Sequence, residues 1–435
     1  MMSGPADKTV RDPQSHVVQA NNRAPVFDLP VRQPGGGFTL LKGVRVLDLT
    51  TSVAGPYATM LLSEFGAEVI KIERPDIGDD SRNWGPPFLD GKSLGHASVN
   101  RNKKSVCLDY SSGPGRAAFE ELVRKCDILV TNQLPKVRAK LNTDYETLSA
   151  LNPALVYASV TGFGTTGVRS SWACYDIIAE GYSGVMEVTG EAENDPQKIG
   201  TPAGDLLAGG DAALSCLAAL FDARSTGKGH YIDVSMVESM TRFLIPRATV
   251  YLGSGEEPRR TGAKDSVIAI YQTFRTSDSY ITLALNSDPV WRRFWEVVGD
   301  KGYGAQERFK DNAGRHAARS ELVHRIQDLL ATRTGAEWLK LFNDNGVPAG
   351  PILTVRETTE DVELLDRGMF FATEAGGSLI PQVGLGIHID GGDAGFRAPP
   401  PELGQDSDAV LGSLLNYGES GLEELRRAGA IPPRQ

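Results

Sequence analysis

Residues 44–75 read VRVLDLTTSVAGPYATMLLSEFGAEVIKIERP, and this stretch decides the fold. The apolar run at 44–49 is typical of a buried strand, and residues 68–73 have the same character. Between them, residues 57–66 carry apolar side chains at helical spacing and end at a glycine. Two buried strands joined by a helix predict a parallel βαβ unit.

The same alternation continues to about residue 200. Further strands are expected at 105–109, 127–131 and 154–160, with helices at 115–125 and 145–151. This order predicts an α/β, Rossmann-like, doubly wound sheet, which binds ligands at the carboxyl ends of its strands. The expected binding edge is therefore formed by the loops after Leu49, Ile72, Leu108 and Thr131.

A chain of 435 residues is long enough for two domains. We expect residues 1–40 to form an extended arm, 41–225 the first part of a large domain, and 226–255 a linker helix that Pro246 kinks or divides. A composition shift at 253–262 opens a smaller α/β domain at 256–345. Residues 346–435 then form a second linker and return to the large domain.

Composition excludes several classes of function. A net charge of −10 argues against general nucleic-acid binding but allows a local basic pocket. The four cysteines and six histidines lack metal-ligand spacing, so no metal site is expected. Glycine-rich nucleotide-binding motifs are also absent from the sequence. No apolar run reaches the roughly 18 residues that span a bilayer, and residues 1–38 lack a secretory segment, so we expect a cytoplasmic protein without a membrane partner.

Asp205 stands directly before an apolar helical pattern at 206–223. An aspartate in this position is most often an N-cap. However, Ala203 and Gly204 leave the carboxylate uncrowded, and the glycine pair at 209–210 allows another backbone or a ligand to approach. A helix N-terminus also favours the ionised form that a nucleophile requires. A helix cap and a nucleophile both fit this residue.

Two other stretches are open to two interpretations. Cys174 is either a nucleophile or a packed thiol, and the adjacent Tyr175 either lines a site or belongs to the core. Residues 100–104 carry three cations before a strand, which either bind phosphates or form a solvated turn.

Taken together, the motifs resemble class III CoA-transferases, the family of formyl-CoA transferase, carnitine CoA-transferase and the α-methylacyl-CoA racemases. The resemblance runs from about residue 41 to the C-terminus. Its blocks are LKGVRVLD (41–48), AGP (54–56), GAEVIKIERP (66–75), NKKSV (102–106), GFG (162–164), YD (175–176), AGDL (203–206), TGKG (226–229), GVPAGP (346–351) and RAPPP (397–401).

This resemblance implies that Asp205 is a nucleophile that attacks an acyl-CoA thioester, giving a mixed anhydride and then an aspartyl-CoA thioester. An incoming carboxylic acid takes over the CoA through a second anhydride. Coenzyme A and acyl-CoA are then substrates, and no permanently bound cofactor is expected. The resemblance also implies an interlocked homodimer. The implied CoA contacts are Val53, Ala54, Arg74, Leu108, Ser111, Asn132, Lys140 and Tyr175.

The chain departs from its relatives at several of these positions. Val53 stands where formyl-CoA transferase has a glutamine, and Ser111 and Ala173 replace lysines, so the acyl preference and the grip on the nucleotide end can both differ. The family's glycine loop would fall near Gly262, where this chain has fewer glycines.

Alternatives remain for the activity and the substrate. The racemase branch has a histidine at the position of Tyr175, and phenols ordinarily titrate near 10, which favours transferase over racemase. A noncatalytic CoA-binding homologue, with Asp205 as a cap, is the other alternative. Four arginines are candidates to pair with a dicarboxylate such as succinate, or are surface charges: Arg82, Arg101, Arg259 and Arg260.

Overall fold

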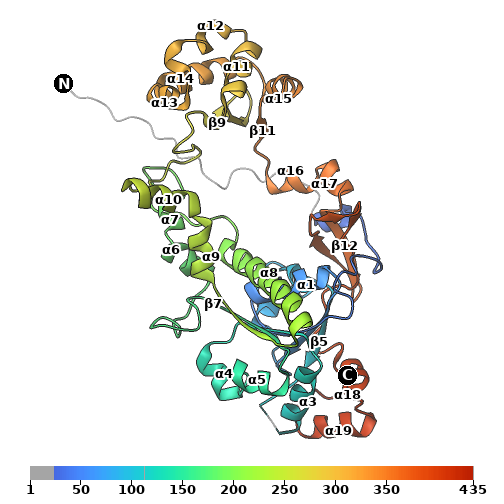
Figure 1. The fold of residues 1–435 in the computed structure, drawn as a ribbon. Coiled ribbons are helices and arrows are strands. Elements are labelled where there is room, and N and C mark those ends of the chain that lie inside the picture. The colour runs from blue at the N-terminus through green and yellow to red at the C-terminus, as the bar shows by residue number, and fades with distance from the viewer. Residues whose placement is uncertain (1–23, 112, 435) are drawn as a thin grey trace, which may run out of the picture.

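The computed structural model describes residues 24–111 and 113–434, so the first 23 residues of the predicted arm lie outside the described residues. Its centre is a six-stranded, fully parallel sheet in the order β5-β2-β1-β6-β7-β8 (Figure 1). The α/β, Rossmann-like fold is thus confirmed. The strands are β1 (Arg45–Leu49), β2 (Glu68–Glu73), β5 (Lys103–Cys107), β6 (Ile128–Thr131), β7 (Val156–Thr161) and β8 (His230–Ser235).

Helices cover both faces of this sheet because its strands are apolar on both sides. One face packs against α1 (Ala54–Glu64), α6 (Asp176–Tyr182), α8 (Ala203–Thr226) and α9 (Met236–Phe243). The other packs against α3 (Gly113–Arg124), α5 (Tyr145–Leu151), α18 (Ser407–Leu415) and α19 (Glu419–Arg427). The last two helices bring the C-terminal segment back to the sheet (Figure 1).

Strand order reverses beside β1, because the chain fills one side with β2 and β5 before β6 begins the other. Open parallel sheets bind ligands at such a point, outside the carboxyl ends of the strands. Helix α4 (Pro135–Leu141) follows β6 at this edge.

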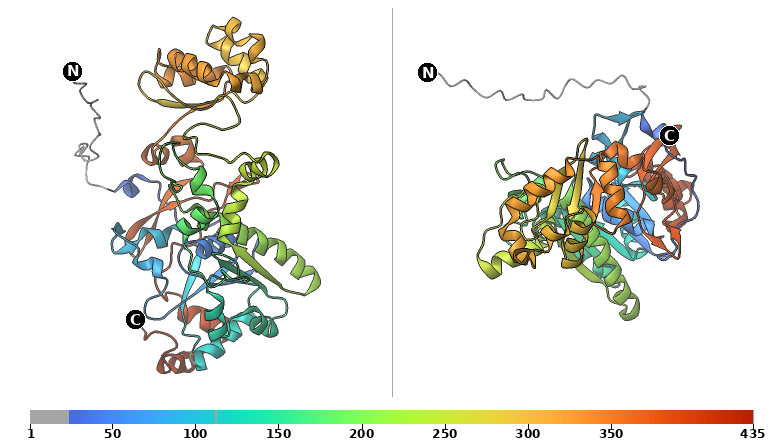
Figure 2. Two further views of the ribbon diagram at one scale, coloured as in Figure 1. Left: turned by 90° about the vertical axis from the view of Figure 1, so that its left-hand side faces the viewer. Right: turned by 90° about the horizontal axis from the view of Figure 1, so that it is seen from above.

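Residues 270–347 have a hydrophobic core of their own, built around Trp291, Phe294, Trp295 and Phe342. Their antiparallel sheet has the order β11-β10-β9. Figures 1 and 2 show this part standing away from the six-stranded sheet. Its elements are β9 (Tyr271–Arg275), β10 (Tyr280–Ala284), α11 (Asp288–Val297), α12 (Lys301–Gly304), α13 (Asn312–Ala317), α14 (Arg319–Leu330), α15 (Gly335–Asp344) and β11 (Ala349–Pro351).

Two connections lead to this part and back. The first contains α9 and α10 (Ile245–Ser254), and Pro246 lies in the first turn of α10, which confirms the predicted division. The second contains α16 (Val355–Thr359) and α17 (Val362–Asp366). The described part of the arm packs at the far end of the second connection, where the Arg32 N–H donates to the Ala372 carbonyl at 2.8 Å.

The remaining elements are short. They are α2 (Leu94–Ser98), α7 (Val185–Val188) and the hairpins β3 (Phe88–Leu89) with β4 (Lys92–Ser93), β12 (Phe370–Ala375) with β13 (Ser378–Val383), and β14 (His388–Ile389) with β15 (Gly392–Asp393).

The cations at 100–104 were expected either to bind phosphates or to form a solvated turn. The first two of them, Arg101 and Lys103, do neither. Arg101 is buried and pairs with Glu64 at 2.8 Å, and Lys103 is buried and pairs with Asp48 at 3.1 Å. Only Lys104 remains exposed. A charge run at the start of a strand was misread because its carboxylate partners come from distant parts of the sequence.

Candidate active site

A cleft of about 920 Å³ opens at the carboxyl edge of the sheet. The cleft is lined by the strand ends that the sequence predicted as the binding edge. Leu49, Ile72 and Leu108 line it, and so does Gln133, which lies just after β6. Other lining residues come from the loops 73–80 and 109–111 and from α4. The ligand-binding edge expected from the strand pattern is therefore a real cavity.

Three of the predicted CoA contacts line this cleft, namely Arg74, Leu108 and Ser111. Arg74 is exposed and pairs with Asp80 at 2.8 Å, so its cation is accessible at the rim. Lys140 does not line the cleft, although its helix α4 contributes Val137 and Leu141.

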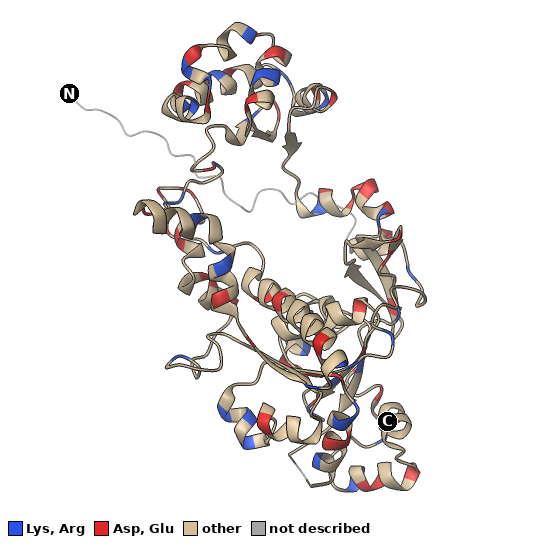
Figure 3. Ribbon diagram, in the orientation of Figure 1, with Lys and Arg blue, Asp and Glu red and all other residues tan. Residues whose placement is uncertain are grey.

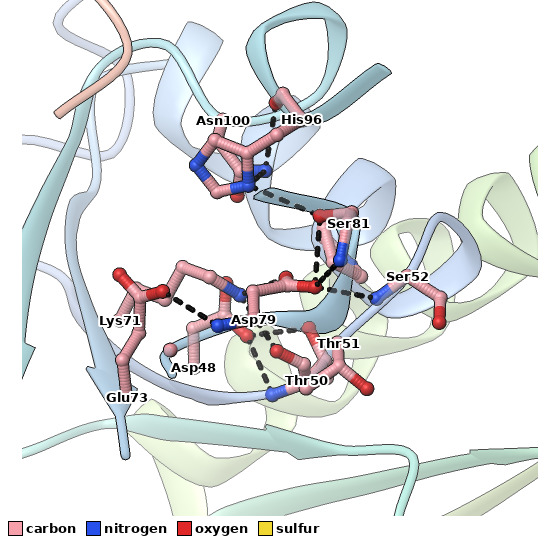
Figure 4. Close-up of polar contacts among 12 residues, drawn as sticks. Asp48, Thr50, Thr51, Ser52, Lys71, Glu73, Asp79, Ser81, His96 and Asn100 are labelled. Atoms are coloured by element: carbon pink, nitrogen blue, oxygen red, sulfur yellow. Dashed lines mark hydrogen bonds and ion pairs between the residues drawn. The ribbon is translucent and has the colours of Figure 1, made fainter. Parts of the chain in front are cut away.

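Asn132 acts on the loop after β1 rather than on the cavity. Its side-chain oxygen accepts the Thr51 N–H at 3.1 Å, and its amide nitrogen donates to the Thr51 carbonyl at 2.7 Å. Two further side chains fix the neighbours of Thr51. Lys71 donates to the Thr50 carbonyl at 2.6 Å, and Asp79 accepts the N–H of Ser52, which has a left-handed φ of 70°, at 3.1 Å (Figure 4).

These contacts belong to a fully buried charge cluster beneath the cleft. Lys71 pairs with Asp79 at 2.8 Å, and both side chains are inaccessible to solvent. Burial alone would lower the pKa of Lys71, but Asp48 and Asp79 outweigh it and raise that pKa. Likewise, burial would raise the pKa of Asp79, but Lys71 holds it well below its usual range. Sequence reasoning missed the cluster, although Asp48 and Lys71 are charged, face each other across β1 and β2, and stand in otherwise apolar strands.

The loop ends at Ala54, the first residue of α1, and here it reaches Asp205. The Ala54 backbone N–H faces the carboxyl of Asp205 and lowers its pKa. Asp205 is the third residue of α8, whose N-cap residue is Pro202. The expectation that Asp205 caps its own helix is therefore wrong, because α8 begins at Ala203, three residues earlier than the sequence pattern placed it. The donor instead belongs to another helix.

The charge state of Asp205 also differs from expectation. Burial, and after it the nearby charge of Asp176, raise the pKa of this carboxyl to about 6, although the Ala54 N–H acts against both. A position near a helix N-terminus favours the anion, but here desolvation outweighs that effect.

Helices α1 and α8 come this close because Gly209 has no side chain. A Cβ at Gly209 would lie 2.6 Å from the Ala54 carbonyl oxygen and 3.0 Å from the Tyr57 ring. At Gly210 a Cβ would meet nothing within 4 Å. Of the glycine pair, only Gly209 permits the close approach.

Helix α6 supports Asp205 from the other side. Its first residue, Asp176, accepts the Gly204 N–H at 2.8 Å, directly before Asp205. Tyr175 precedes it, 70% exposed, and lies outside the lining of the large cleft. Burial raises the pKa of Cys174 to about 11, so at neutral pH this residue is a thiol rather than a thiolate nucleophile.

The other predicted residues lie farther from this cleft. Val53 is the N-cap residue of α1, one position before Ala54. Gly262 has a φ of 62°, donates its N–H to the Gly190 carbonyl at 2.8 Å, and lines a separate hollow of about 680 Å³ on the antiparallel sheet. Of the four arginines considered for a dicarboxylate, Arg82, Arg101 and Arg260 are paired with Glu73, Glu64 and Glu187, and Arg259 is exposed.

No group of three or more metal-ligating side chains gathers within residues 24–111 and 113–434. One helix of this part, α8, is long and apolar enough to cross a membrane by length and composition, and it packs against α1 and β7.

The fold and this site define an enzyme of CoA-transferase family III, and the chain belongs to that family, whose model matches residues 41–407. It is 35% identical to the succinyl-CoA:glutarate CoA-transferase of Mus musculus over 90% of each chain. The succinate–glutarate CoA-transferase of Agrobacterium fabrum is also 35% identical, over 89% of this chain and 97% of that protein. A crystal structure of a CaiB/BaiF family protein from Brucella suis superposes with a TM-score of 0.76 at 33% identity, over 87% of this chain and all of that one. The resemblance stated from the motifs is thus confirmed, and the relatives support CoA transfer.

Proposed function

We propose that this enzyme moves CoA from an acyl-CoA thioester to a carboxylic acid, with Asp205 as the nucleophile. One observation carries the proposal. The Asp205 carboxylate meets a backbone N–H at the end of the same loop whose first residues, Thr50 and Thr51, line the large cleft. A bound CoA in the cleft and a reactive carboxylate would then lie at the two ends of one short loop.

The reaction follows from the exchange of activated acyl groups. An Asp205 oxygen attacks the thioester carbonyl, the carbon–sulfur bond breaks, and CoA leaves as a thiolate, so that a mixed anhydride of Asp205 and the donor acyl group remains. The thiolate attacks the Asp205 carbonyl and releases the first carboxylate, which leaves an aspartyl-CoA thioester. The acceptor carboxylate attacks that thioester and forms a second anhydride. The thiolate then takes the acceptor's acyl group and restores the Asp205 carboxylate.

The Ala54 N–H assists these steps by its position. It stabilises the ionised Asp205 before the first attack. When the Asp205 carbonyl is itself attacked, negative charge develops on its oxygen, and a fixed N–H donor at a helix N-terminus stabilises that charge. The loop contacts from Lys71, Asp79 and Asn132 keep this donor in place.

We assign the nucleotide end of CoA to the large cleft. Arg74 and Ser111 would meet phosphate groups, Lys140 would approach from α4, and Leu108 would contact the adenine. Val53, Ala54 and Tyr175 would lie toward the thioester end. Asn132 would act indirectly, by holding Thr51.

The substrates we propose are dicarboxylic acids of four or five carbons and their CoA thioesters. The support comes from the two transferases above, whose names specify succinyl-CoA or succinate together with glutarate.

We further propose that two chains form the interlocked homodimer of the family, in the cytoplasm. Helix α8 carries few charges (Figure 3), and it exposes 68% of Leu214 and 84% of Phe221. Leu252 on α10 is 81% exposed. A second copy covering these side chains would remove apolar surface from water.

The decisive experiment replaces the nucleophile. Asp205→Asn should abolish CoA exchange between succinyl-CoA and glutarate while retaining the fold and the affinity for CoA. Hydroxylamine added during turnover of the unmodified enzyme should leave a hydroxamate on Asp205, found by mass spectrometry. Exchange at the normal rate in the variant would refute the role of Asp205. Deuteration of a 2-methylacyl-CoA in deuterated water without an acceptor acid would favour the racemase instead.

A further inference from the structure

Glu180 is an acidic residue in an unusual place. It lies one turn after Asp176 on α6, and its relative exposure is 0%. Its Oε2 accepts the Ile199 N–H at 2.7 Å. Its Oε1 is buried and meets no hydrogen-bond donor in the part of the chain that the structure describes.

The group that Glu180 does meet is another carboxyl. The side chains of Glu180 and Asp176 are within hydrogen-bonding contact, and this contact raises the pKa of Glu180, after burial as the larger cause. Within residues 24–111 and 113–434, neither carboxyl forms an ion pair. A buried anion and a half-buried anion in contact repel each other, whereas a single proton between them gives the unpartnered oxygen of Glu180 a hydrogen bond.

We propose that Glu180 is protonated at neutral pH, donates a hydrogen bond from its carboxyl O–H to Asp176, and in this neutral form positions the segment 199–204 that presents Asp205 to Ala54. The importance of Glu180 for catalysis rests on the proposed function of Asp205, whereas the protonation of Glu180 does not.

The positioning follows from where the two carboxyls bind. Glu180 holds the N–H of Ile199, and Asp176 holds the N–H of Gly204, so one turn of α6 anchors both ends of the segment. The proton keeps the two side chains together without adding negative charge. Since the charge of Asp176 already raises the pKa of Asp205, ionisation of Glu180 would oppose formation of the nucleophilic anion.

The other charged groups around α6 leave this arrangement intact. Lys198, on the segment before α8, lowers the pKa of Glu180, but this ammonium is exposed and donates to the Ile199 carbonyl at 2.7 Å. On α7, Glu187 pairs with Arg260 at 3.0 Å. On α8 and α9, Asp211 pairs with Arg242, and Glu238 is exposed.

Two substitutions separate a neutral hydrogen-bonding group from a charged one. In Glu180→Gln, the amide can still donate to Asp176 and accept from Ile199, whereas Glu180→Ala can do neither. We expect Glu180→Gln to keep kcat/KM within about twofold at pH 7, and Glu180→Ala to lose about tenfold or more, since displaced reactive groups slow catalysis steeply. At alkaline pH, the unmodified enzyme should lose activity as Glu180 ionises, and Glu180→Gln should not. Glu238→Gln, the same change at an exposed site on α9, should match the unmodified enzyme throughout.

The proton itself is measured in the substrate-free protein by infrared spectroscopy at pH 8. The unmodified protein and Glu238→Gln should show the carbonyl absorption of a buried, protonated carboxyl group, and Glu180→Gln should lack it. This measurement is independent of turnover, so it stands even if Asp205 is not the nucleophile. A spectrum in which Glu180→Gln removes no such band would overturn the proposal. So would a loss of activity in Glu180→Gln as large as in Glu180→Ala, or full activity in Glu180→Ala.

Discussion

The Ala54 N–H at the start of α1 faces the Asp205 carboxyl near the start of α8 and lowers its pKa. Two helices therefore begin against each other, and the anion of one is stabilised by the N-terminal dipole of the other. Burial works in the opposite direction and leaves the pKa of Asp205 at about 6. The balance gives a carboxylate that is largely ionised at neutral pH yet less well solvated than a surface aspartate, a suitable state for a nucleophile.

The first prediction concerns the acid limb of the rate profile. The anion of Asp205 is the reactive form, and its pKa is about 6. We therefore expect kcat/KM to level off between this pH and the alkaline range, and to fall about tenfold for each pH unit well below it. Initial rates in buffers of constant ionic strength give the profile. A limb near pH 4, where free aspartates titrate, would contradict the burial of this carboxyl in the working enzyme.

The second prediction concerns the effect of the same residue on stability. The pKa of Asp205 is higher in the folded chain than its ordinary value of 3.8. The folded state then holds more protons between these values, so the free energy of unfolding falls as pH rises from about 4 to 6 and stays reduced above it. Asp205→Asn should thus stabilise the protein at pH 7 by about 1 to 3 kcal/mol while abolishing exchange. Urea denaturation at pH 7 and at pH 4 measures this, and the gain should shrink at the lower pH.

The third prediction tests the contact between α1 and α8. Gly209→Ala places a methyl group 2.6 Å from the Ala54 carbonyl oxygen, so the helices must separate and the Ala54 donor must leave Asp205. We expect a loss of stability of about 1 to 3 kcal/mol and a fall in kcat. Gly210→Ala is the matched control, because its methyl group meets nothing and alanine is the better helix former by about 1 kcal/mol. Equal effects of both substitutions on kcat would show that the close contact between α1 and α8 is not needed for catalysis.

The fourth prediction concerns the rim of the cleft. If Arg74 binds a phosphate of CoA, Arg74→Ala should weaken CoA binding about tenfold, the effect of losing one hydrogen bond to a charged group. Titration calorimetry gives the affinity. Arg124→Ala on α3 removes an exposed arginine outside the cleft lining and should leave CoA binding unchanged. Unchanged binding in Arg74→Ala would place the nucleotide elsewhere.

The sequence predicted what local periodicity determines. The runs at 44–49 and 68–73 contain β1 and β2, the helix at 145–151 matches α5, and Pro246 lies where α9 gives way to α10. The sequence did not predict those element boundaries that are set by side-chain hydrogen bonds. β9 begins only at Tyr271, because Asp265 accepts the N–H groups of Val267 and Ile268 and forms a turn before it.

The site was harder to predict, since its partners are far apart in the chain. Asp205 was found through its family motif and its apolar helix, but no local pattern indicates that its hydrogen-bond donor is Ala54. The carboxyl of Glu180 is likewise interpretable only once Ile199 and Asp176 are seen around it.

The last prediction concerns the charge cluster that supports the catalytic loop. Lys71 and Asp79 are both inaccessible to solvent, and together they hold Thr50 and Ser52. Lys71→Met leaves Asp79 as a buried charge without its nearest cation, and such a loss costs about 3 to 5 kcal/mol. Glu360→Gln, which breaks the exposed pair with Arg356 on the second connection, should leave the stability nearly unchanged.

Stability alone would not separate a loop support from an ordinary core residue, so the rate profile of the folded fraction is the informative measurement for Lys71→Met. A released loop lets the Ala54 N–H move away from Asp205, and the loss of that donor raises the carboxyl pKa further. The acid limb of kcat/KM should then move to higher pH in Lys71→Met and stay in place in Glu360→Gln. A destabilised variant whose acid limb does not move would mean that the cluster stabilises the fold without holding the Ala54 donor against Asp205.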